Sequence, residues 1–221
     1  MTQLVIFDMD GVLVDSEHAI TLAAMEALHK RGIPALYEDF KPFTGMGERV
    51  FIGSVAEKYG VPFREDMRAD TYEIYCRTAS ERVAVFPWAR TLPQLLVQNG
   101  YKIAVGSAAD DVKVRCNINT IGLDLSLFSA LVTASEVVRK KPDPEIFLRC
   151  AEKSGVDPKH CLVFEDAISG VQAAKAGGMR CIAVTSSFDT ASLYNAGADL
   201  VLDDLTDALQ QIQMLDADQR I

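Results

Sequence analysis

Several features that define other classes of protein are scarce or absent in these 221 residues. No apolar run approaches membrane-spanning length, and the four apolar residues that lead into Asp8 are too few for a signal peptide. The five cysteines are odd in number, form no C-x-x-C pair and have apolar neighbours, which favours buried, reduced thiols. The three histidines show no metal-ligand spacing. We therefore expect a cytoplasmic protein with no membrane partner.

Positive charge is also scarce. The net charge is −9, and the longest basic run is Arg139–Lys141. Binding to nucleic acid depends on lysine and arginine side chains that neutralise phosphates. We therefore expect no nucleic-acid partner, whereas a small charged substrate needs only one local basic residue.

Short apolar runs alternate with longer helical patterns along most of the chain. Continuous apolar runs of this length suit strands buried on both faces of a parallel sheet. These runs are Leu4–Phe7, Lys102–Val105, Leu131–Thr133, Cys161–Phe164, Cys181–Val184 and Asp199–Leu202. The helical patterns between them often end at glycine, and they cover Ala89–Gln98, Asp110–Thr120, Pro144–Ser154, Ala167–Ala176 and Leu205–Leu215. The alternation predicts a doubly wound, Rossmann-like α/β fold.

One stretch interrupts the alternation. Residues 16–82 contain helical patterns at Glu17–Lys30, Glu48–Lys58 and Arg64–Ala79, separated by glycine and proline turns. We therefore predict an α/β core of residues 1–15 and 83–221, with a small α-helical domain of residues 16–82 inserted after the first strand. Trp88, just after the return to the core, either narrows a pocket or packs the hinge.

Two aspartates directly follow the first apolar run. Asp8 and Asp10 are spaced by one residue, and Gly11 follows with a flexible turn. In extended chain, side chains at i and i+2 point the same way, so the two carboxylates share one small space. Their repulsion is costly unless a cation lies between them or one carries a proton. A solvated acidic loop is the alternative interpretation.

A second acidic pair, Glu165 and Asp166, follows the run Cys161–Phe164 and precedes a helix of small residues. Asp166 alone suits a helix cap. Ligands of open α/β sheets, however, bind beyond the carboxyl ends of the strands, where both acidic pairs are expected. Four convergent carboxylates predict a hard divalent cation with oxygen ligands, most simply Mg²⁺.

Two further polar residues are candidates for contact with an anion. Ser107 ends the run Lys102–Gly106, where its hydroxyl and the next N–H groups, including that of Ala108, are able to hold a phosphoryl oxygen or to cap the following helix. Lys141 lies in a proline-stiffened turn, where it either neutralises phosphate and carboxylates as a point charge or faces solvent.

These elements, in this order, resemble the haloacid-dehalogenase-like phosphohydrolases over essentially the whole chain. Asp8–Val12 looks like the first family motif, D-x-D-G-[TV], and Ser107 stands at the second. Lys141-Pro142 looks like the third motif and Glu165-Asp166 like the fourth. The likeness is to the β-phosphoglucomutase-like or phosphoglycolate-phosphatase-like group, which carries a helical cap. A lone D-x-D is weak evidence, but four motifs in order are specific.

The resemblance implies a Mg²⁺-dependent phosphatase that hydrolyses a small phosphomonoester, of the sugar-phosphate or phosphoglycolate type. Asp8 would attack phosphorus to form an aspartyl phosphate, and Asp10 would serve as acid and then base. Mg²⁺ would be held by Asp8, Asp166 and the backbone carbonyl of Asp10, with Glu165 binding directly or through water. The phosphoryl oxygens would be stabilised by Ser107 and Lys141. A monomer or weak homo-oligomer is expected.

The inserted domain contains a loop that looks like the substrate-reading loop of the family. Its two glycines let backbone approach a ligand, and Arg49 offers a fork for a carboxylate or second phosphate, unless it simply faces solvent. The candidate binding residues are Thr44, Gly45, Met46, Gly47, Glu48 and Arg49.

Two rival functions stay open. A phosphosugar mutase of the same family uses the same nucleophile, but it carries a histidine where this chain has Ile20 and a cap lysine near Ala69, where only Arg68 is close. A non-catalytic or phospho-accepting signalling module is disfavoured by Lys141 and by the inserted domain.

Overall fold

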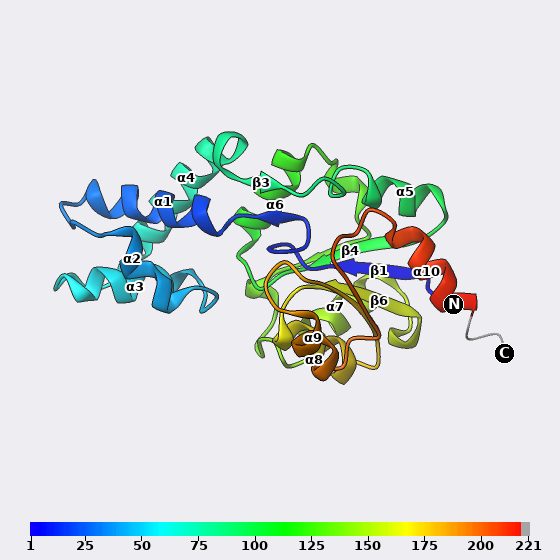
Figure 1. Ribbon diagram of the computed structural model, residues 1–221. Coiled ribbons are helices and arrows are strands. Elements are labelled where there is room, and N and C mark those ends of the chain that lie inside the picture. Colours follow the sequence, from blue (N-terminus) through cyan, green and yellow to red (C-terminus); the bar gives the residue numbers. More distant parts are fainter. Residues whose placement is uncertain (218–221) are drawn as a thin grey trace.

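The core is a parallel sheet of six strands, seen in a computed structural model that describes residues 1–217 (Figure 1). The strands lie in the order β5-β4-β1-β6-β7-β8, and every neighbouring pair is parallel. Their bounds are β1 Leu4–Phe7, β4 Lys102–Gly106, β5 Ala130–Val132, β6 Cys161–Glu165, β7 Arg180–Val184 and β8 Leu200–Leu202. The predicted doubly wound α/β fold is confirmed.

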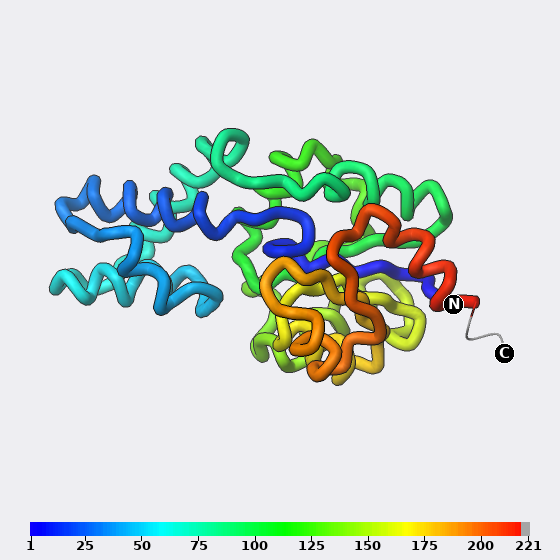
Figure 2. The backbone as a smooth tube through the Cα atoms, in the orientation of Figure 1, coloured from blue at the N-terminus to red at the C-terminus, as the bar shows by residue number. Residues whose placement is uncertain are grey.

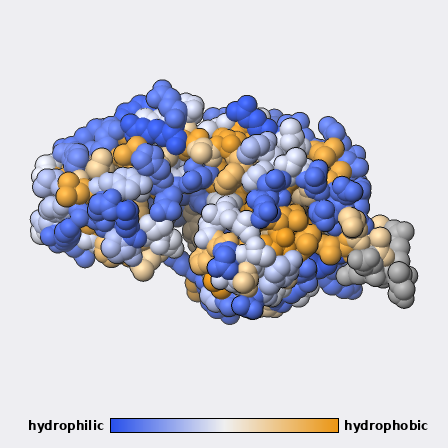
Figure 3. All heavy atoms as spheres, viewed as in Figure 1, coloured by the Kyte–Doolittle hydropathy of each residue, from blue (hydrophilic) through white to orange (hydrophobic). Residues whose placement is uncertain are grey.

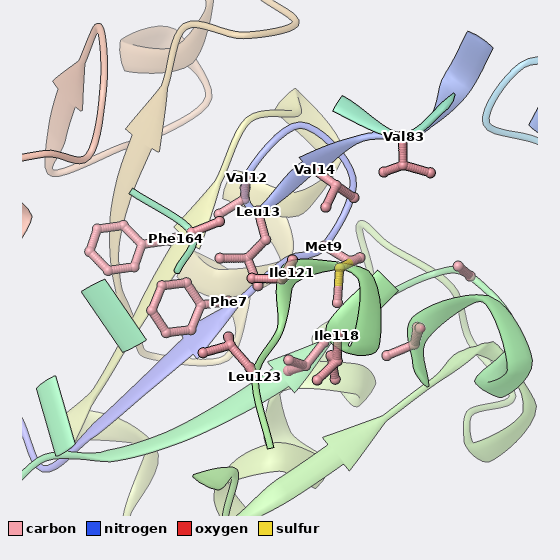
Figure 4. Packing of buried hydrophobic residues seen from close by; sticks show 14 of the residues in the cluster. Phe7, Met9, Val12, Leu13, Val14, Val83, Ile118, Ile121, Leu123 and Phe164 are labelled. Carbon is pink, nitrogen blue, oxygen red and sulfur yellow. The ribbon is translucent and has the colours of Figure 1, made fainter. Parts of the chain in front are cut away.

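Strand β1 lies in the centre of the sheet because it is apolar on both faces. All four of its side chains are fully buried. Val5 and Phe7 join the apolar cluster on one face, whereas Leu4 and Ile6 join the cluster on the other, as alternation along a strand requires. Phe7 packs against Phe164 of β6 with ring centroids 5.3 Å apart (Figure 4). This packing fixes the ends of β1 and β6 next to each other.

Helices cover both faces of the sheet. The first face carries α5 (Leu92–Gln98), α6 (Asp111–Ile121) and α10 (Ala208–Ala217), whose apolar residues belong to the cluster of Phe7. The second face carries α7 (Glu145–Ser154), α8 (Ile168–Ala176) and α9 (Thr190–Asn195). Short 3₁₀ segments lie at Lys41–Phe43, Leu125–Leu127, Ala134–Glu136 and Pro158–His160.

The segment between β1 and the rest of the sheet forms a helical lobe. It consists of α1 (Glu17–His29), α2 (Tyr37–Phe40), α3 (Glu48–Lys58) and α4 (Glu65–Arg82), and it encloses an apolar cluster of its own. Figure 2 shows the chain leaving and re-entering the core side by side, where β2 (Val14–Asp15) pairs with β3 (Ala84–Val85). On the face in Figure 3, hydrophilic side chains cover most of the lobe, and a notch separates it from the core. The helical insert is thus confirmed; its bounds of 16–82 stay a prediction.

Trp88 packs the hinge. Its side chain is buried, its Nε1–H donates to the carbonyl of Val12 over 2.8 Å, and its ring stacks on Phe86 with centroids 4.8 Å apart. The residue therefore ties the returning chain to the turn that follows β1.

Several details differ from the sequence-based expectations. Helix α5 begins at Leu92 and α10 at Ala208, each three residues later than expected, and α4 continues to Arg82. The strands β2 and β3 were not expected because two residues carry no periodic signal. The expectation of buried thiols is wrong for Cys76, which is exposed, and for Cys116, which is partly exposed. No helix among residues 1–217 is long and apolar enough to cross a membrane.

Candidate active site

The nucleophile candidate Asp8 sits where β1 ends. Its backbone N–H donates to the carbonyl of Phe164 over 2.9 Å, which continues the ladder to β6 for one more residue. Asp8 is buried, with 7% of the residue exposed. The chain then turns at Gly11, whose φ is +84° and whose N–H donates to the carbonyl of Val14. The buried strand β1 therefore ends with the Asp8 carboxylate at the carboxyl end of the sheet, and the chain turns away at Gly11.

Glu165 and Asp166 bring two more carboxylates to the same edge from β6. The Oε2 atom of Glu165 accepts the backbone N–H groups of Asp166 (2.8 Å) and Ala167 (2.9 Å). Asp166 lies so close to Gly11 that a Cβ atom there would be 1.9 Å from its Oδ2. Glycine at position 11 is therefore required twice, by the positive φ and by this close approach.

Lys141 lies between these acids. Its Nζ donates to Oδ1 of Asp8 and to Oε1 of Glu165, each over 2.5 Å, and it lies 4.7 Å from the ring centroid of Phe147. Burial lowers the pKa of Lys141, but the charges of Asp8 and Glu165 outweigh burial and raise it well above the usual range. Lys141 is therefore a fixed positive charge beside the nucleophile.

Glu165 thus has both carboxylate oxygens occupied by protein groups. In this arrangement Glu165 holds Lys141 in place. That Glu165 binds Mg²⁺ directly or through water stays a prediction.

Ser107 follows β4, the other neighbour of β1. Its N–H donates to the carbonyl of Val132 over 3.0 Å, and its Oγ accepts the N–H of Ala109 over 3.2 Å. The side chain is buried next to the pocket. The next residues, Ala108 and Ala109, also line the pocket and form the turn that leads into α6.

A cavity of about 660 Å³ between the core and the helical lobe collects these groups. The core supplies Asp8, Asp10, Ser107, Ala108, Lys141, Glu165 and Asp166, as expected. From the lobe come Thr44, Gly45, Gly47 and Glu48, together with the apolar side chains of Ile20 and Phe51.

Two residues of the expected binding loop do not line this cavity. Met46 is 53% exposed. The Arg49 side chain is 75% exposed, lies 3.7 Å from the Glu65 carboxylate and stacks on the Phe63 ring. Arg49 is only the second residue of α3, and at that position the helix points it along the outer surface of the lobe. The prediction that Arg49 reads the substrate therefore has no support from a contact with this cavity.

Other pocket residues were missed. Lys140 and the serines 16, 169, 186 and 187 also line the cavity, and Lys140 is at the same time exposed to solvent. The ammonium of Lys113 is buried in the same cavity and donates to Oδ2 of Asp10 over 2.9 Å. One signal was available in the sequence: a lysine in the first turn of a helix opposes the helix dipole and needs a nearby acid.

The electrostatics of the site favour a cation. Burial, followed by the charge of Glu165, raises the pKa of Asp166 to about 8. Burial raises the pKa of Asp8 to about 7 even though Lys141 opposes the shift. The two acidic pairs carry four carboxylates, and the two lysines that bond to them, Lys113 and Lys141, leave an excess of two negative charges among these groups. A divalent cation is the simplest group that would balance this excess.

The oxygen ligands available at this site fit Mg²⁺ only if a backbone carbonyl and water molecules complete its coordination. Among residues 1–217, no three histidine, cysteine, aspartate or glutamate side chains stand together as a metal site. Two carboxylates, Asp8 and Asp166, remain available with the carbonyl of Asp10. Mg²⁺ usually keeps several waters and takes only one or two carboxylates, so this set is sufficient.

The model of the haloacid dehalogenase-like hydrolase family matches residues 2–178, so the chain belongs to the haloacid dehalogenase-like hydrolases. It is 41% identical over 205 residues to the chloroplast protein SUPPRESSOR OF QUENCHING 1 of Arabidopsis thaliana, covering 91% of this chain but only 19% of that relative. A phosphorylated carbohydrates phosphatase of Thermotoga maritima is 30% identical over 199 residues, covering 89% of this chain and 92% of the relative.

A solved structure of a provisionally assigned β-phosphoglucomutase of Thermotoga maritima has the same fold. Its TM-score is 0.78 with 28% identity, and the match covers 96% of this chain and 100% of that one. The predictions of the family, of its helically capped fold and of a hydrolytic enzyme are therefore confirmed. One relative is a chloroplast protein, and a cytoplasmic location stays a prediction.

Proposed function

We propose that this chain is a Mg²⁺-dependent phosphatase that hydrolyses small phosphomonoesters through an aspartyl phosphate on Asp8. One observation carries the proposal: Asp8, Ser107, Lys141 and Asp166, which follow three separate strands and a turn, line a single cavity beneath the helical lobe. Phosphoryl transfer depends chiefly on alignment and on neutralised charge, and this cavity offers both.

The proposed roles follow from the contacts. A carboxylate oxygen of Asp8 attacks phosphorus, the bond to the ester oxygen breaks, and Asp10, which enters this step protonated, gives that oxygen its proton. Asp10 then takes a proton from water as the water attacks the aspartyl phosphate, which releases inorganic phosphate and restores Asp8. Lys141 and Ser107 hold the phosphoryl oxygens. Mg²⁺, held by Asp8, Asp166 and the Asp10 carbonyl, would neutralise charge on the transferring group.

The lobe restricts the substrate to a small molecule and excludes bulk water. Thr44, Gly45, Gly47 and Glu48, with Ile20 and Phe51, form the part of the cavity lining that comes from the lobe. Serine and threonine hydroxyls line much of the remaining wall, which suits a substrate rich in hydroxyl groups. The phosphorylated carbohydrates phosphatase among the relatives supports a sugar or polyol phosphate.

A phosphosugar mutase is the second candidate, supported by the likeness to an assigned β-phosphoglucomutase. The cavity wall has Ile20 where that activity expects histidine. The nearby cap cation, Arg68, pairs with Glu65 at 2.8 Å and with Asp110 at 3.3 Å and does not line the cavity. The presence of Ile20 in the cavity wall and the absence of Arg68 from it favour the phosphatase over the mutase.

Release of inorganic phosphate from a panel of phosphomonoesters, with and without Mg²⁺, tests the proposal. We expect Mg²⁺-dependent release, fastest for sugar or polyol phosphates. Conversion of β-glucose 1-phosphate to glucose 6-phosphate in the presence of a sugar bisphosphate, without phosphate release, would establish the mutase instead. If the protein catalyses neither reaction, both the phosphatase and the mutase proposals are overturned.

A further inference from the structure

Lys113 is a buried charge that the proposed reaction does not use. It lies in the first turn of α6 and is 6% exposed. Burying an ammonium is costly, and placing it near the positive end of a helix adds to the cost. Such a residue requires a strong anionic partner, and here the partner is Asp10, whose Oδ2 accepts from Nζ over 2.9 Å.

Both oxygens of the Asp10 carboxylate are in fact held. Oδ1 accepts a hydrogen bond from Ser16 Oγ, while Oδ2 accepts from Lys113. Ser16 is almost fully buried and is the N-cap of α1, at the point where the chain enters the helical lobe. Asp10 is therefore held by hydrogen bonds from a core helix, through Lys113, and from the base of the lobe, through Ser16.

The lobe also contributes to the surroundings of Lys113. Glu48, the first residue of α3, lines the same cavity. Burial lowers the pKa of Lys113, but the charges of Asp10 and Glu48, with a smaller effect from Asp8, more than offset it and keep the pKa raised. In return, the charge of Lys113 opposes the rise that burial causes in the pKa of Glu48. Lys113 thus remains an ammonium that faces acids from both lobes.

We propose that Lys113 is a positioning residue: with Ser16, it orients the Asp10 side chain, which as the carboxyl gives its proton to the leaving group and as the carboxylate takes one from the attacking water. The inference rests on the proposed phosphatase mechanism. It predicts that loss of Lys113 spares the attack by Asp8 on a substrate whose leaving group needs no proton. Every step that needs a correctly aligned Asp10 slows.

Pre-steady-state hydrolysis of p-nitrophenyl phosphate by the full chain in Mg²⁺ separates these steps. The burst of p-nitrophenol reports attack by Asp8, and the later steady rate reports water attack assisted by Asp10. For Lys113→Met we expect the burst rate to stay within about threefold of the unaltered protein and the steady rate to fall about a hundredfold, the typical effect of misplaced acid–base catalysis. KM for glucose 6-phosphate should change little, while its kcat falls at least as far.

Arg115→Met is the matched control, because Arg115 lies on the same helix but is exposed and pairs with Asp111 at 2.8 Å. It should leave both phases unchanged. A steady rate within threefold of normal in Lys113→Met, with the burst intact, would overturn the inference.

A second variant, Ser16→Ala, tests the inference if Lys113→Met does not fold. If Lys113→Met loses its helical circular dichroism along with the burst, Ser16→Ala decides, because it removes the other grip on Asp10 without exposing an unpaired charge. We expect its steady rate to fall about tenfold with the burst preserved, and an unchanged steady rate would refute the positioning role. If the unaltered protein releases no phosphate from p-nitrophenyl phosphate in Mg²⁺, it is the proposed phosphatase function that fails.

Discussion

Replacing Gly170 with alanine tests how tightly the charged groups of the site are packed. Gly170 lies in α8, outside the reacting centre, but a Cβ atom there would be 1.8 Å from Oε1 of Glu165. Glu165 is 1% exposed and cannot retreat without breaking its bonds to two backbone N–H groups and to Lys141. The variant therefore disturbs Lys141 through one intermediate side chain.

The expected magnitude follows from opposing effects. Alanine gains about 1 kcal/mol over glycine in a helix. Against this, overpacking costs about 1–3 kcal/mol, and each hydrogen bond lost from the charged Glu165 costs about 1.5–3 kcal/mol. Loss of even one bond outweighs the helical gain. We expect Gly170→Ala to lower the free energy of unfolding by about 2–4 kcal/mol.

Urea unfolding at pH 7 and phosphate release measure the two consequences. Activity should fall together with stability, because a displaced Glu165 no longer holds Lys141 beside Asp8. Gly177→Ala, at the end of the same helix, is the control: φ there is −77° and its new Cβ would make only ordinary contacts at 3.4 Å. Equal stability and activity of the two variants would refute this account of the packing.

Three further predictions concern other charges. Lys141→Met should lose activity and lower the free energy of unfolding in urea by about 3–5 kcal/mol, because the buried carboxylates lose their counter-charge. Mg²⁺ should raise the melting temperature of this variant more than that of the unaltered protein. An unchanged free energy of unfolding would contradict the role of Lys141 as a counter-charge. Burial tends to raise the pKa of Asp216, but hydrogen bonds from Arg180 and Thr2 more than offset it and lower that pKa. Its contribution is therefore present above the unfolded-state pKa and lost as pH falls through the folded-state value, so Asp216→Ala should cost about 1–3 kcal/mol at pH 7 and progressively less as acid protonates the native carboxylate. A pH-independent difference would argue against that linkage. Arg49→Ala should leave KM for a sugar phosphate within about twofold, because the side chain faces solvent; a tenfold rise would return Arg49 to the binding site.

The parts of the fold that sequence could predict are those with a repeating physical signal. Fully apolar runs such as Leu4–Phe7 have only one stable location in a sheet covered on both faces, and the observed strand has the expected bounds. Helix α3 likewise has the expected bounds. The two-residue strands β2 and β3 carry no such signal, since their pairing depends on where the lobe begins and ends.

The site divides in the same way. Asp8, Asp10 and Asp166 were predictable because each follows a buried strand, and parallel strands bring such ends together. Side chains on the lobe depend on how helices are rotated about their axes, which no short motif fixes. That is why Glu48 faces the cavity whereas Arg49, its neighbour, does not. Lys113 was missed because its partner, Asp10, is 103 positions away in the sequence.

Detection of a phosphorylated Asp8 tests the central claim most directly. The protein would be mixed with a phosphomonoester in Mg²⁺, quenched rapidly in acid, and digested for peptide mass spectrometry, with Asp8→Asn run in parallel. The account predicts a phosphoryl group on the peptide at Asp8 of the unaltered protein, dependent on Mg²⁺, and neither label nor phosphate release in the variant. Continued phosphate release by Asp8→Asn, or a label on another residue, would contradict it.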